Sequence, residues 1–346
     1  MAGPTGGLIF LLAGSLILVG CSRGSPQPAE SVSASGSANP SGAETLVTFA
    51  WPDGAEPTVT RAQAGLDERY INPGAVIEHD GQLHMFANLF TAWPGRVRVQ
   101  HLVSSDGESW TLDASEPVFD SEDVSFTDEG ADVSTGFVAS DGTWVLIFET
   151  VSSVDPWVLG RATAPAPEGP WTIDPAPILE GGGEGSWDAG LAWPSVVATV
   201  DGYAMFYTAF DRIGGTGVIG RATSPDGVTW TKGAAPVLVA ERDWERGSLD
   251  RPRVAMTPRG LLMVYAGDDL TDRGVAWSAD DGVTWRRDAD RPAITQGNFP
   301  IDGRAWDAAL VVRDGTLVYY LEIGTASGPE GTQVYRATAE LPATTP

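Results

Sequence analysis

From about residue 45 onward, short apolar runs alternate with glycine-containing turns. The runs are rich in aromatic and β-branched residues, and their short length between turns predicts β-strands. No long stretch shows the periodicity of an amphipathic helix, so the pattern indicates an all-β fold. The clearest series of runs, each preceded by a turn such as Asp80-Gly81, is Gln82–Asn88, Thr143–Glu149, Tyr203–Thr208, Leu261–Ala266 and Thr316–Glu322.

Each run of this series belongs to a larger repeat of about 50–60 residues that holds three or four predicted strands. A further apolar run precedes it, as Ala75–Ile77 does in the first copy. Another follows it, as Gly220–Thr223 does in the third copy. Five copies of a four-stranded antiparallel meander predict a five-bladed β-propeller, because a single sandwich would not give matched copies.

A turn motif marks the third and fourth predicted strands of several copies. Ser224–Trp230 reads Ser-Pro-Asp-Gly-Val-Thr-Trp, and Ser104–Trp110 and Ser278–Trp285 are related to it. Asp-Gly between two predicted strands is a strong hairpin signal, because both residues tolerate positive φ. We assign the motif to the outer hairpin of each blade. The tryptophans that follow these hairpins are interpreted as structural: Trp110, Trp171, Trp230 and Trp285.

The fifth copy ends after its third strand, at Thr338, whereas Thr45–Ala50 is an extra strand at the other end of the domain. We predict that this segment closes the ring as the outer strand of blade five. Closure of this kind buries the sheet edges that an open array would expose. The predicted propeller domain spans residues 44–346.

The N-terminal region has the composition of a targeting signal. Leu8–Val19 is an apolar run too short to span a bilayer as a mature helix, and it leads to Cys21, the single cysteine. This arrangement resembles a bacterial lipobox, although Met1–Gly7 lacks the usual basic residues. We expect residues 1–20 to be a signal peptide, Cys21 to be lipidated, and residues 21–43 to be a flexible linker. The protein would then be extracytoplasmic, anchored to the bacterial cell membrane only through that lipid.

The charge balance excludes two classes of partner. Acidic side chains number 46 against 21 basic ones, which gives a formal net charge of −25. Nucleic acid and anionic membrane surfaces would be repelled, whereas a neutral polar ligand or a cation is compatible with this charge. The 13 tryptophans supply rings either for packing or for stacking on sugars. We expect a glycan or oligosaccharide as the partner, a monomer, and no cofactor.

In a propeller, the first strand of each blade lines the central channel, and two sets of loops open on one face. An Asn or Asp recurs near the start of every predicted first strand: Asn72, Asp132, Asp188, Asp250 and Asp307. Turn chemistry can explain any one of them. As a set around one axis they would crowd like charges, which suits acid–base chemistry or cation binding. The candidate catalytic carboxylates are Asp132, Asp188, Asp250 and Glu322.

Glycoside hydrolysis fits these residues, because it needs two carboxyl groups that flank the scissile bond and further groups that hold the sugar. The candidate substrate contacts are Asn72, Arg69, Trp93, Trp187, Trp193, Arg251, Arg253, Trp306 and Asp307. No metal site is expected from the spacing of acids, His and Cys. The acidic run Asp120–Glu129 lacks EF-hand spacing and is interpreted as a solvated loop, with a Ca²⁺ site as the alternative.

Several phrases of the sequence recur in a known superfamily. In blade one they are Tyr70–Ile77 and Asp80–Phe86, and further along Glu168–Trp171, Ser186–Gly190, Trp193–Val197, Met205–Tyr207 and Arg251–Val254. They resemble the five-bladed β-propeller glycosidases, which include invertases, levansucrases, arabinanases, xylosidases and the related mannoside phosphorylases. The resemblance covers residues 65–340 or thereabouts. It implies the propeller fold and a carbohydrate substrate.

The catalytic triad of the invertase-like families does not carry over residue by residue. Those families have an Asp before the Pro of blade one, where this chain has Asn72. Their second Asp stands in an Arg-Asp-Pro context that Asp132 lacks, and their acid Glu is replaced by Ala192. Two hypotheses follow: a glycoside hydrolase that uses other carboxylates, or a non-catalytic glycan-binding or structural propeller.

A sialidase-like exo-glycosidase is a further alternative. The hairpin motif resembles the Asp-box of sialidases and matches it fully at Ser278–Trp285. Sialidases usually have six blades, an arginine trio and a Tyr/Glu nucleophile pair. Here Tyr265 would be the nucleophile, and the trio would come from Arg69, Arg251, Arg253 and Arg304.

Overall fold

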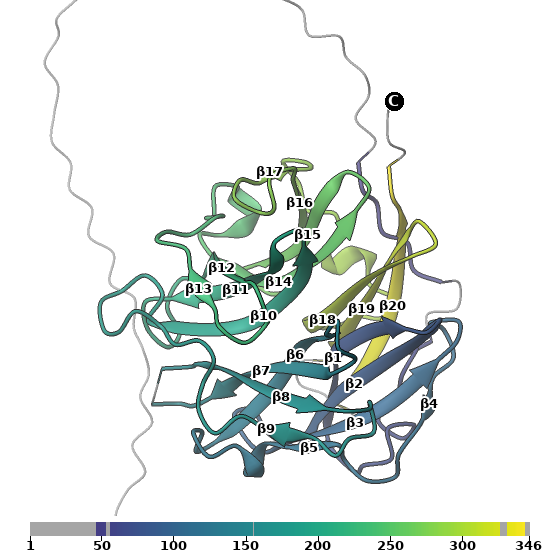
Figure 1. Cartoon of the computed structure of the whole chain (residues 1–346). Helices are drawn as coiled ribbons and strands as arrows, with labels where there is room; N and C mark the ends of the chain where they lie inside the picture. The colour runs from purple at the N-terminus through teal and green to yellow at the C-terminus, as the bar shows by residue number, and fades with distance from the viewer. Residues whose placement is uncertain (1–45, 53–55, 155, 326–330, 343–346) are drawn as a thin grey trace, which may run out of the picture. The chain divides into compact units, whose positions relative to one another are not determined.

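The computed structural model describes residues 46–52, 56–154, 156–325 and 331–342, and these form an all-β structure of five antiparallel sheets arranged in a ring (Figure 1). The predicted five-bladed propeller is therefore confirmed. The predicted signal peptide, the lipidation site Cys21 and the linker lie outside the described residues. Within the described part, no helix is both long and apolar enough to cross a membrane.

Each sheet is a meander whose strands follow chain order from the inside outward. Blade one contains β1 (Tyr70–His79), β2 (Gln82–Phe90), β3 (Val97–Ser104) and β4 (Thr111–Leu112), with β5 (Phe119–Asp120) also paired to β3. Blade two contains β6 (Gly130–Val138), β7 (Trp144–Val151), β8 (Leu159–Ala164) and β9 (Thr172–Ile173). Blade three contains β10 (Gly190–Thr199), β11 (Gly202–Phe210), β12 (Val218–Ser224) and β13 (Thr231–Lys232).

The last two blades differ in how many strands they draw from their own repeat. Blade four contains β14 (Leu249–Thr257), β15 (Gly260–Gly267), β16 (Arg273–Ser278) and β17 (Arg286–Arg287). Blade five contains β18 (Arg304–Arg313), β19 (Thr316–Gly324) and β20 (Thr332–Glu340). The described helices are short 3-10 turns between blades: η1 (Ser121–Asp123), η2 (Asp243–Glu245) and η3 (Gln296–Asn298).

The N-terminal segment completes blade five, as the sequence predicts. Ala50 and Thr338 exchange two backbone hydrogen bonds, of 2.8 and 2.9 Å, and Val59 pairs with Val334 further along β20. Phe49 is buried with its ring 5.6 Å from that of Tyr319 on β19. The two ends of the described chain therefore close the ring between them.

The predicted hairpins lie between the third and fourth strands of their blades. In blade three, Ser224 Oγ accepts backbone N–H groups from Asp226 and Gly227 at 3.3 and 2.8 Å. Asp226 Oδ1 in turn accepts the backbone N–H groups of Val228 and Thr229, both at 2.9 Å. The side chains of the motif are therefore occupied in stabilising its own turn.

The tryptophans that follow these hairpins pack against the preceding blade, which confirms their structural assignment. Trp171 of blade two meets Phe86 of blade one at 5.4 Å between ring centroids, and Trp285 of blade four meets Phe206 of blade three at 5.3 Å. Trp110 of blade one meets Tyr320 of blade five at 5.6 Å, across the point of closure. The same kind of aromatic contact thus joins blade two to blade one, blade four to blade three, and blade one to blade five.

A β-bulge interrupts the first strand of every blade. In β1, β10, β14 and β18 two residues stand opposite one residue of the second strand, whereas in β6 the single residue Ser134 is inserted between two consecutive pairs. The bulge of β10 holds Trp193 at φ 48°, and that of β14 holds Arg251 at φ 49°. A positive φ is uncommon for residues other than glycine, and bulges of this kind redirect side chains. The bulges therefore set which side chains of the inner strands face the site.

The bulges also correct one expectation. The recurring Asn and Asp residues do not occupy one equivalent position: Asn72 and Asp250 directly precede the bulge, whereas Asp307 lies inside it. Asp132 pairs with Glu149 one residue before its register shift, and Asp188 precedes β10 altogether. A slip of one residue turns a strand side chain to the other face of the sheet. Spacing along the sequence alone could not assign these facings.

Candidate functional site

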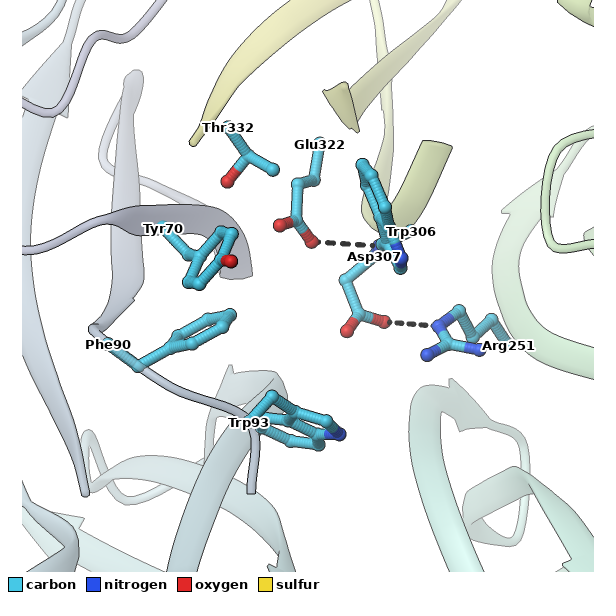
Figure 2. A pocket seen from close by; sticks show the side chains of 8 residues that line it. All are labelled: Tyr70, Phe90, Trp93, Arg251, Trp306, Asp307, Glu322 and Thr332. Carbon is cyan, nitrogen blue, oxygen red and sulfur yellow. Dashed lines mark hydrogen bonds and ion pairs between the residues drawn. The ribbon is translucent and has the colours of Figure 1, made fainter. Parts of the chain in front are cut away.

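A pocket of about 220 Å³ opens where the inner ends of blades one, four and five meet (Figure 2). Apolar rings form one side of it, and two carboxyl groups and a guanidinium form the other. We call it the central pocket. It is lined by Tyr70, Phe90, Trp93, Arg251, Trp306, Asp307, Glu322 and Thr332.

Asp307 and Glu322 bring two carboxyl groups into the central pocket from adjacent strands of blade five. Asp307 lies in the bulge of β18, and its backbone N–H donates to Glu322 Oε2 at 3.2 Å. Both residues are more than 90% buried, with 7% of Asp307 and 3% of Glu322 exposed. Figure 2 shows both carboxyl groups directed into the space that Tyr70 and Phe90 face.

The two carboxyl groups have different electrostatic surroundings. Asp307 Oδ1 accepts from Arg251 Nε at 3.1 Å and lies 3.4 Å from Arg253 Nη2. Burial raises the pKa of Glu322 to about 8, and the neighbouring charge of Asp307 adds to this shift. At neutral pH, Glu322 therefore holds a proton next to a carboxylate that two guanidinium groups contact. This is the arrangement of an acid–base pair.

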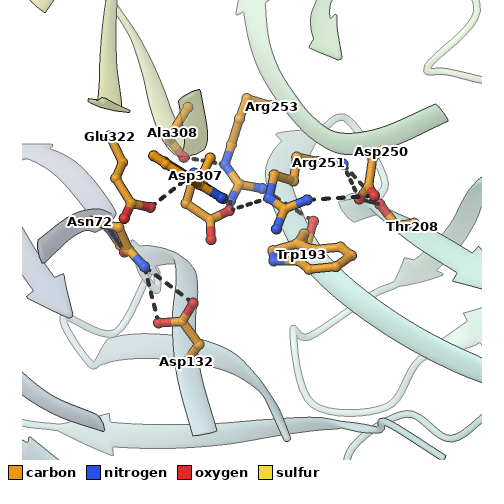
Figure 3. Close-up of polar contacts among 12 residues, drawn as sticks. Asn72, Asp132, Trp193, Thr208, Asp250, Arg251, Arg253, Asp307, Ala308 and Glu322 are labelled. Carbon is orange, nitrogen blue, oxygen red and sulfur yellow. Dashed lines mark hydrogen bonds and ion pairs between the residues drawn. The ribbon is translucent and has the colours of Figure 1, made fainter. Parts of the chain in front are cut away.

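Arg251 connects the central pocket to blade three. Its guanidinium carbon lies 3.9 Å from the centroid of the Trp193 ring, so that a cation stacks on an indole (Figure 3). Its Nη1 lies 3.5 Å from Asp250 Oδ2, whose other oxygen accepts from Thr208 Oγ1 at 3.1 Å. Burial raises the pKa of Asp250, and Arg251 opposes that shift.

Arg253 supports this arrangement from behind the central pocket. It is 3% exposed, its Nε donates to the carbonyl oxygen of Ala308, and its Nη1 donates to the carbonyl oxygen of Trp193 at 3.2 Å. These contacts tie blade four to the bulges of its two neighbours. Arg253 is not among the residues that line the pocket, so we assign it a positioning role toward Asp307.

Asn72 and Asp132 form a second polar cluster on the inner strands (Figure 3). Asn72 Nδ2 lies 3.3 and 3.4 Å from the two oxygens of Asp132. The amide orientation is fixed because Asn72 Oδ1 accepts from Asn88 Nδ2 at 2.7 Å and from the backbone N–H of Gly74 at 2.9 Å. Both Asn72 and Asp132 are only 1% exposed.

Glu149 stands opposite Asp132 in the pairing of β6 with β7, and it is fully buried. Burial raises the pKa of Glu149 to about 8, and it raises that of Asp132 well above its usual range, with Glu149 adding to the effect. Burial thus favours the protonated form of both of these adjacent carboxyl groups. Asp132 belongs to this second polar cluster and is not among the residues that line the central pocket.

Asp188, Trp187 and Arg69 do not line the central pocket. Asp188 Oδ2 accepts from Lys232 Nζ at 2.6 Å. Burial raises the pKa of Asp188, but the hydrogen bonds from Lys232 and Ser186 outweigh that effect and leave its pKa lowered. Trp187 packs on the apolar core of blade three, and the exposed Arg69 lies over the Tyr70 ring at 5.0 Å.

Trp93 and Trp306 both line the central pocket, and Trp93 is 38% exposed at its rim. The rings continue beyond the pocket: Trp93 lies 6.2 Å from Trp157, and Trp157 lies 5.5 Å from Trp193. Sequence reasoning did not select Trp157, Tyr70 or Asn88 for the site, and it named Glu149 only as a residue of the loops that open on the pocket face. For Asn88 and Glu149 a signal existed, because a polar residue ends an otherwise apolar strand.

The residues of two alternative hypotheses have other contacts. Tyr265 donates its hydroxyl to Glu245 Oε1 at 2.8 Å, in the core between blades three and four, and it does not line the central pocket. In the acidic run, Asp120 and Glu122 both pair with Arg96. No group of three or more acids, His or Cys among the described residues is placed to hold a metal ion.

The comparisons with known proteins agree at the level of fold. No protein-family model and no curated protein sequence matches the chain. A glycosyl hydrolase from Bacteroides ovatus is similar in structure with a TM-score of 0.62 at 16% identity, covering 85% of this chain and 94% of that one. A thermostable family-43 glycoside hydrolase gives 0.61 at 16% identity, covering 80% and 94%.

A third structure comes from the family-130 mannoside phosphorylases, described as containing glycoside hydrolases that target beta-1,2 mannosidic linkages in Candida mannan. It gives a TM-score of 0.61 at 17% identity, covering 88% of this chain and 98% of that one. The chain thus shares its fold with glycoside hydrolases over most of its own length and most of theirs, as the sequence resemblance implies.

Proposed function

We propose that the protein is a glycoside hydrolase in which Glu322 is the general acid and Asp307 is its carboxylate partner. The observation that carries this proposal is the pair itself: two carboxyl groups in one pocket, one protonated by burial and one contacted by two guanidinium groups. Environments that separate two neighbouring carboxyl groups in this way assign the acid and the base of a reaction.

In the reaction we propose, Glu322 donates its proton to the glycosidic oxygen as the bond to the anomeric carbon breaks. Asp307 then either takes a proton from the attacking water or bonds to the anomeric carbon until water replaces it. In the first route Asp307 ends with the proton of the water and Glu322 without one, and exchange with solvent returns a proton to Glu322. In the second route Glu322 takes the proton of the incoming water as Asp307 leaves the anomeric carbon. Both routes add one water molecule across the bond. Tyr70, Phe90 and Trp93 supply apolar surface for the sugar faces.

The experiment compares Glu322→Gln and Asp307→Asn with wild type on aryl glycosides and oligosaccharides. We expect each substitution to lower kcat/KM by at least about 1,000-fold, because each removes a group that acts on the transition state. Asp174→Asn is the matched control, since this carboxylate pairs with Arg161 on the outer part of blade two. Melting temperatures of all variants separate loss of chemistry from loss of fold.

A second candidate function is glycan binding without catalysis. Asn72 and Ala192 favour it, because they stand where the invertase-like families carry two of their acids. Asn72 here serves as a neutral hydrogen-bond partner of Asp132. Binding of oligosaccharides by wild type, with no turnover of any of them, would support this function and reject the hydrolase.

We also propose that the protein is a lipoprotein at the outer face of a bacterial membrane. The apolar run before Cys21 and the polar stretch after it support this proposal. Metabolic labelling with a palmitate analogue should mark the wild-type protein and leave the Cys21→Ala variant unlabelled. Labelling of the variant at the wild-type level would contradict it.

A further inference from the structure

A row of aromatic rings leads away from the central pocket across the face of blades one to three. The Phe90 ring lies 5.4 Å from that of Trp93, which is followed by Trp157 at 6.2 Å. Trp157 then contacts both Trp193 at 5.5 Å and Phe210 at 5.8 Å. The Nε1 of Trp157 donates to the carbonyl oxygen of Ser152 at 2.7 Å, which fixes the direction of its ring.

Two further hollows follow this row. One of about 130 Å³ lies between Trp157, Trp193 and Asp250, and one of about 370 Å³ lies beyond it. Phe210 and Ile213 line both hollows, and the stacked pair of Arg251 and Trp193 separates the first from the central pocket. We call this path the blade-three groove, defined by Trp157, Trp193, Phe210, Ile213 and Asp250.

The central pocket is too small to hold a long ligand by itself. Its volume of about 220 Å³ lies below the roughly 300 Å³ at which pockets for drug-sized ligands begin. The groove continues it with flat apolar surface and with polar groups at its edge. Ile213 is 40% exposed although it is a large apolar side chain, and it lies beside the Asp211–Arg212 pair. Exposed apolar surface that adjoins a polar site marks a binding surface.

We infer that the blade-three groove binds the continuation of a neutral oligosaccharide whose terminal unit occupies the central pocket. This inference rests on the proposed function for the identity of the central site and adds the substrate class: neutral chains of three or more sugars. The rings would stack on the apolar faces of successive sugars, while Asp250 and Arg212 lie within the same hollows to meet hydroxyl groups.

Charge selects neutral chains over acidic ones. Asp250 and Asp307 both lie along the path, and Arg251 already contacts both of them. Arg212 is paired with Asp211 at 2.6 Å. A uronic or sialic acid unit would therefore meet carboxyl groups whose compensating cations are occupied, in a protein whose net charge is −25.

The test measures Kd, and kcat/KM wherever turnover occurs, for gluco-, manno-, galacto- and xylo-oligosaccharides of one to five units. We expect at least one series to gain about tenfold or more in affinity or kcat/KM between one and three units, and then to level off. The Ile213→Ala variant should lose most of that gain and keep the wild-type values for the single-unit aryl glycoside. Oligo-uronates of equal length should bind at least tenfold more weakly.

The control is Val228→Ala, which removes an equally exposed β-branched side chain from the same blade at its outer hairpin. It should keep the wild-type dependence on chain length. Length-dependent binding without hydrolysis would reject the hydrolase and leave the groove in place. The groove would be rejected if Kd and kcat/KM did not change with chain length, or if none of the four series bound. Binding of oligo-uronates as tightly as neutral chains would reject the preference for neutral sugars.

Discussion

Asp307 and Glu322 carry the same functional group in one pocket, yet their neighbours differ. Asp307 accepts from Arg251 and lies within 3.4 Å of Arg253, whereas Glu322 accepts the backbone N–H of Asp307 (Figures 2 and 3). Burial raises the pKa of Glu322 to about 8 although the charge of Arg251 opposes that shift. The contacts that distinguish the two carboxyl groups thus come from two arginines of a different blade.

Glu149 gives a prediction at the same scale. Burial raises its pKa from 4.5 to about 8. Between these two values the folded protein keeps a proton that the unfolded chain releases, so stability falls as pH rises through this window. We expect Glu149→Gln to be more stable than wild type at pH 8, by on the order of 2–4 kcal/mol, and to differ little below pH 4.5. Urea unfolding at several pH values measures this.

The matched control for that prediction is Glu78→Gln. The carboxyl group of Glu78 is 38% exposed and lies near the C-terminal end of β1. Its stability should follow the wild-type curve across the whole pH range. Equal curves for Glu149→Gln and wild type would mean that Glu149 is ionised in the folded protein at pH 8 without cost.

The sequence indicated which residue types gather at the axis, and it placed Glu322, Asp307, Arg251 and Trp93 among the candidates. It could not separate Asp188, whose partner Lys232 lies 44 positions further along the chain, from the carboxyl groups of the pocket. Ion pairs between distant segments depend on the packed structure. The candidate residues were therefore predictable as a set, and their individual roles were not.

The β-bulges of the inner strands matter most at the scale of the element. Each bulge shifts the register between the first and second strands of its blade. The bulge of β10 holds Trp193 at positive φ, and that of β14 holds Arg251 at positive φ. Backbone conformations of this kind cost free energy and are retained where the surrounding structure requires them. Short apolar runs bounded by glycine-containing turns predicted the strands themselves, because both signals can be read along the sequence. The bulges leave no comparable periodic signal.

Gly74 tests the bulge of β1. It adopts φ 53°, and a Cβ atom at this position would lie 2.1 Å from the backbone oxygen of Phe86. Gly74→Ala should therefore destabilise the protein by about 3 kcal/mol or more, and it should also disturb the amide of Asn72, which Gly74 orients. Denaturant unfolding gives the first quantity.

Gly81→Ala is the matched control for Gly74→Ala. Gly81 adopts φ 77° in the turn after the same strand, but a Cβ atom there would have open space around it. Only the positive φ then opposes the substitution, and we expect a loss of about 1 kcal/mol. Equal losses for the two variants would show that the bulge of β1 can relax.

At the scale of the whole molecule, the ring is held by contacts between consecutive blades and by one closure. Repetition of the strand pattern predicted the five blades, and the missing fourth strand of the last copy predicted where the N-terminal segment goes. Ala50 and Thr338 meet in a short backbone bridge, and Val47 donates its N–H to Asp288 Oδ2 at 2.8 Å. Incomplete repeats are informative because an unpaired strand edge needs a partner.

Removal of the closing segment gives the last prediction. The reference is a chain that starts at Leu46, which retains the segment from Val47 to Ala50. A chain that starts at Trp51 loses the buried side chains of Val47 and Phe49. We expect it to lose about 4 kcal/mol or more of unfolding free energy, measured by denaturant titration. Equal stability of the two chains would show that the ring does not need this strand.

The pairing of Ala50 with Thr338 also has a consequence for biosynthesis. The segment that completes blade five leaves the ribosome before any of the blades, yet its partner β20 (Thr332–Glu340) is made only after blades one to four. Blades one to four pair strands of their own repeats, whereas the first segment has no partner until β20 is present. The ring can therefore lock only after translation has passed β20, and the waiting strand is the place where a holding chaperone would be most useful.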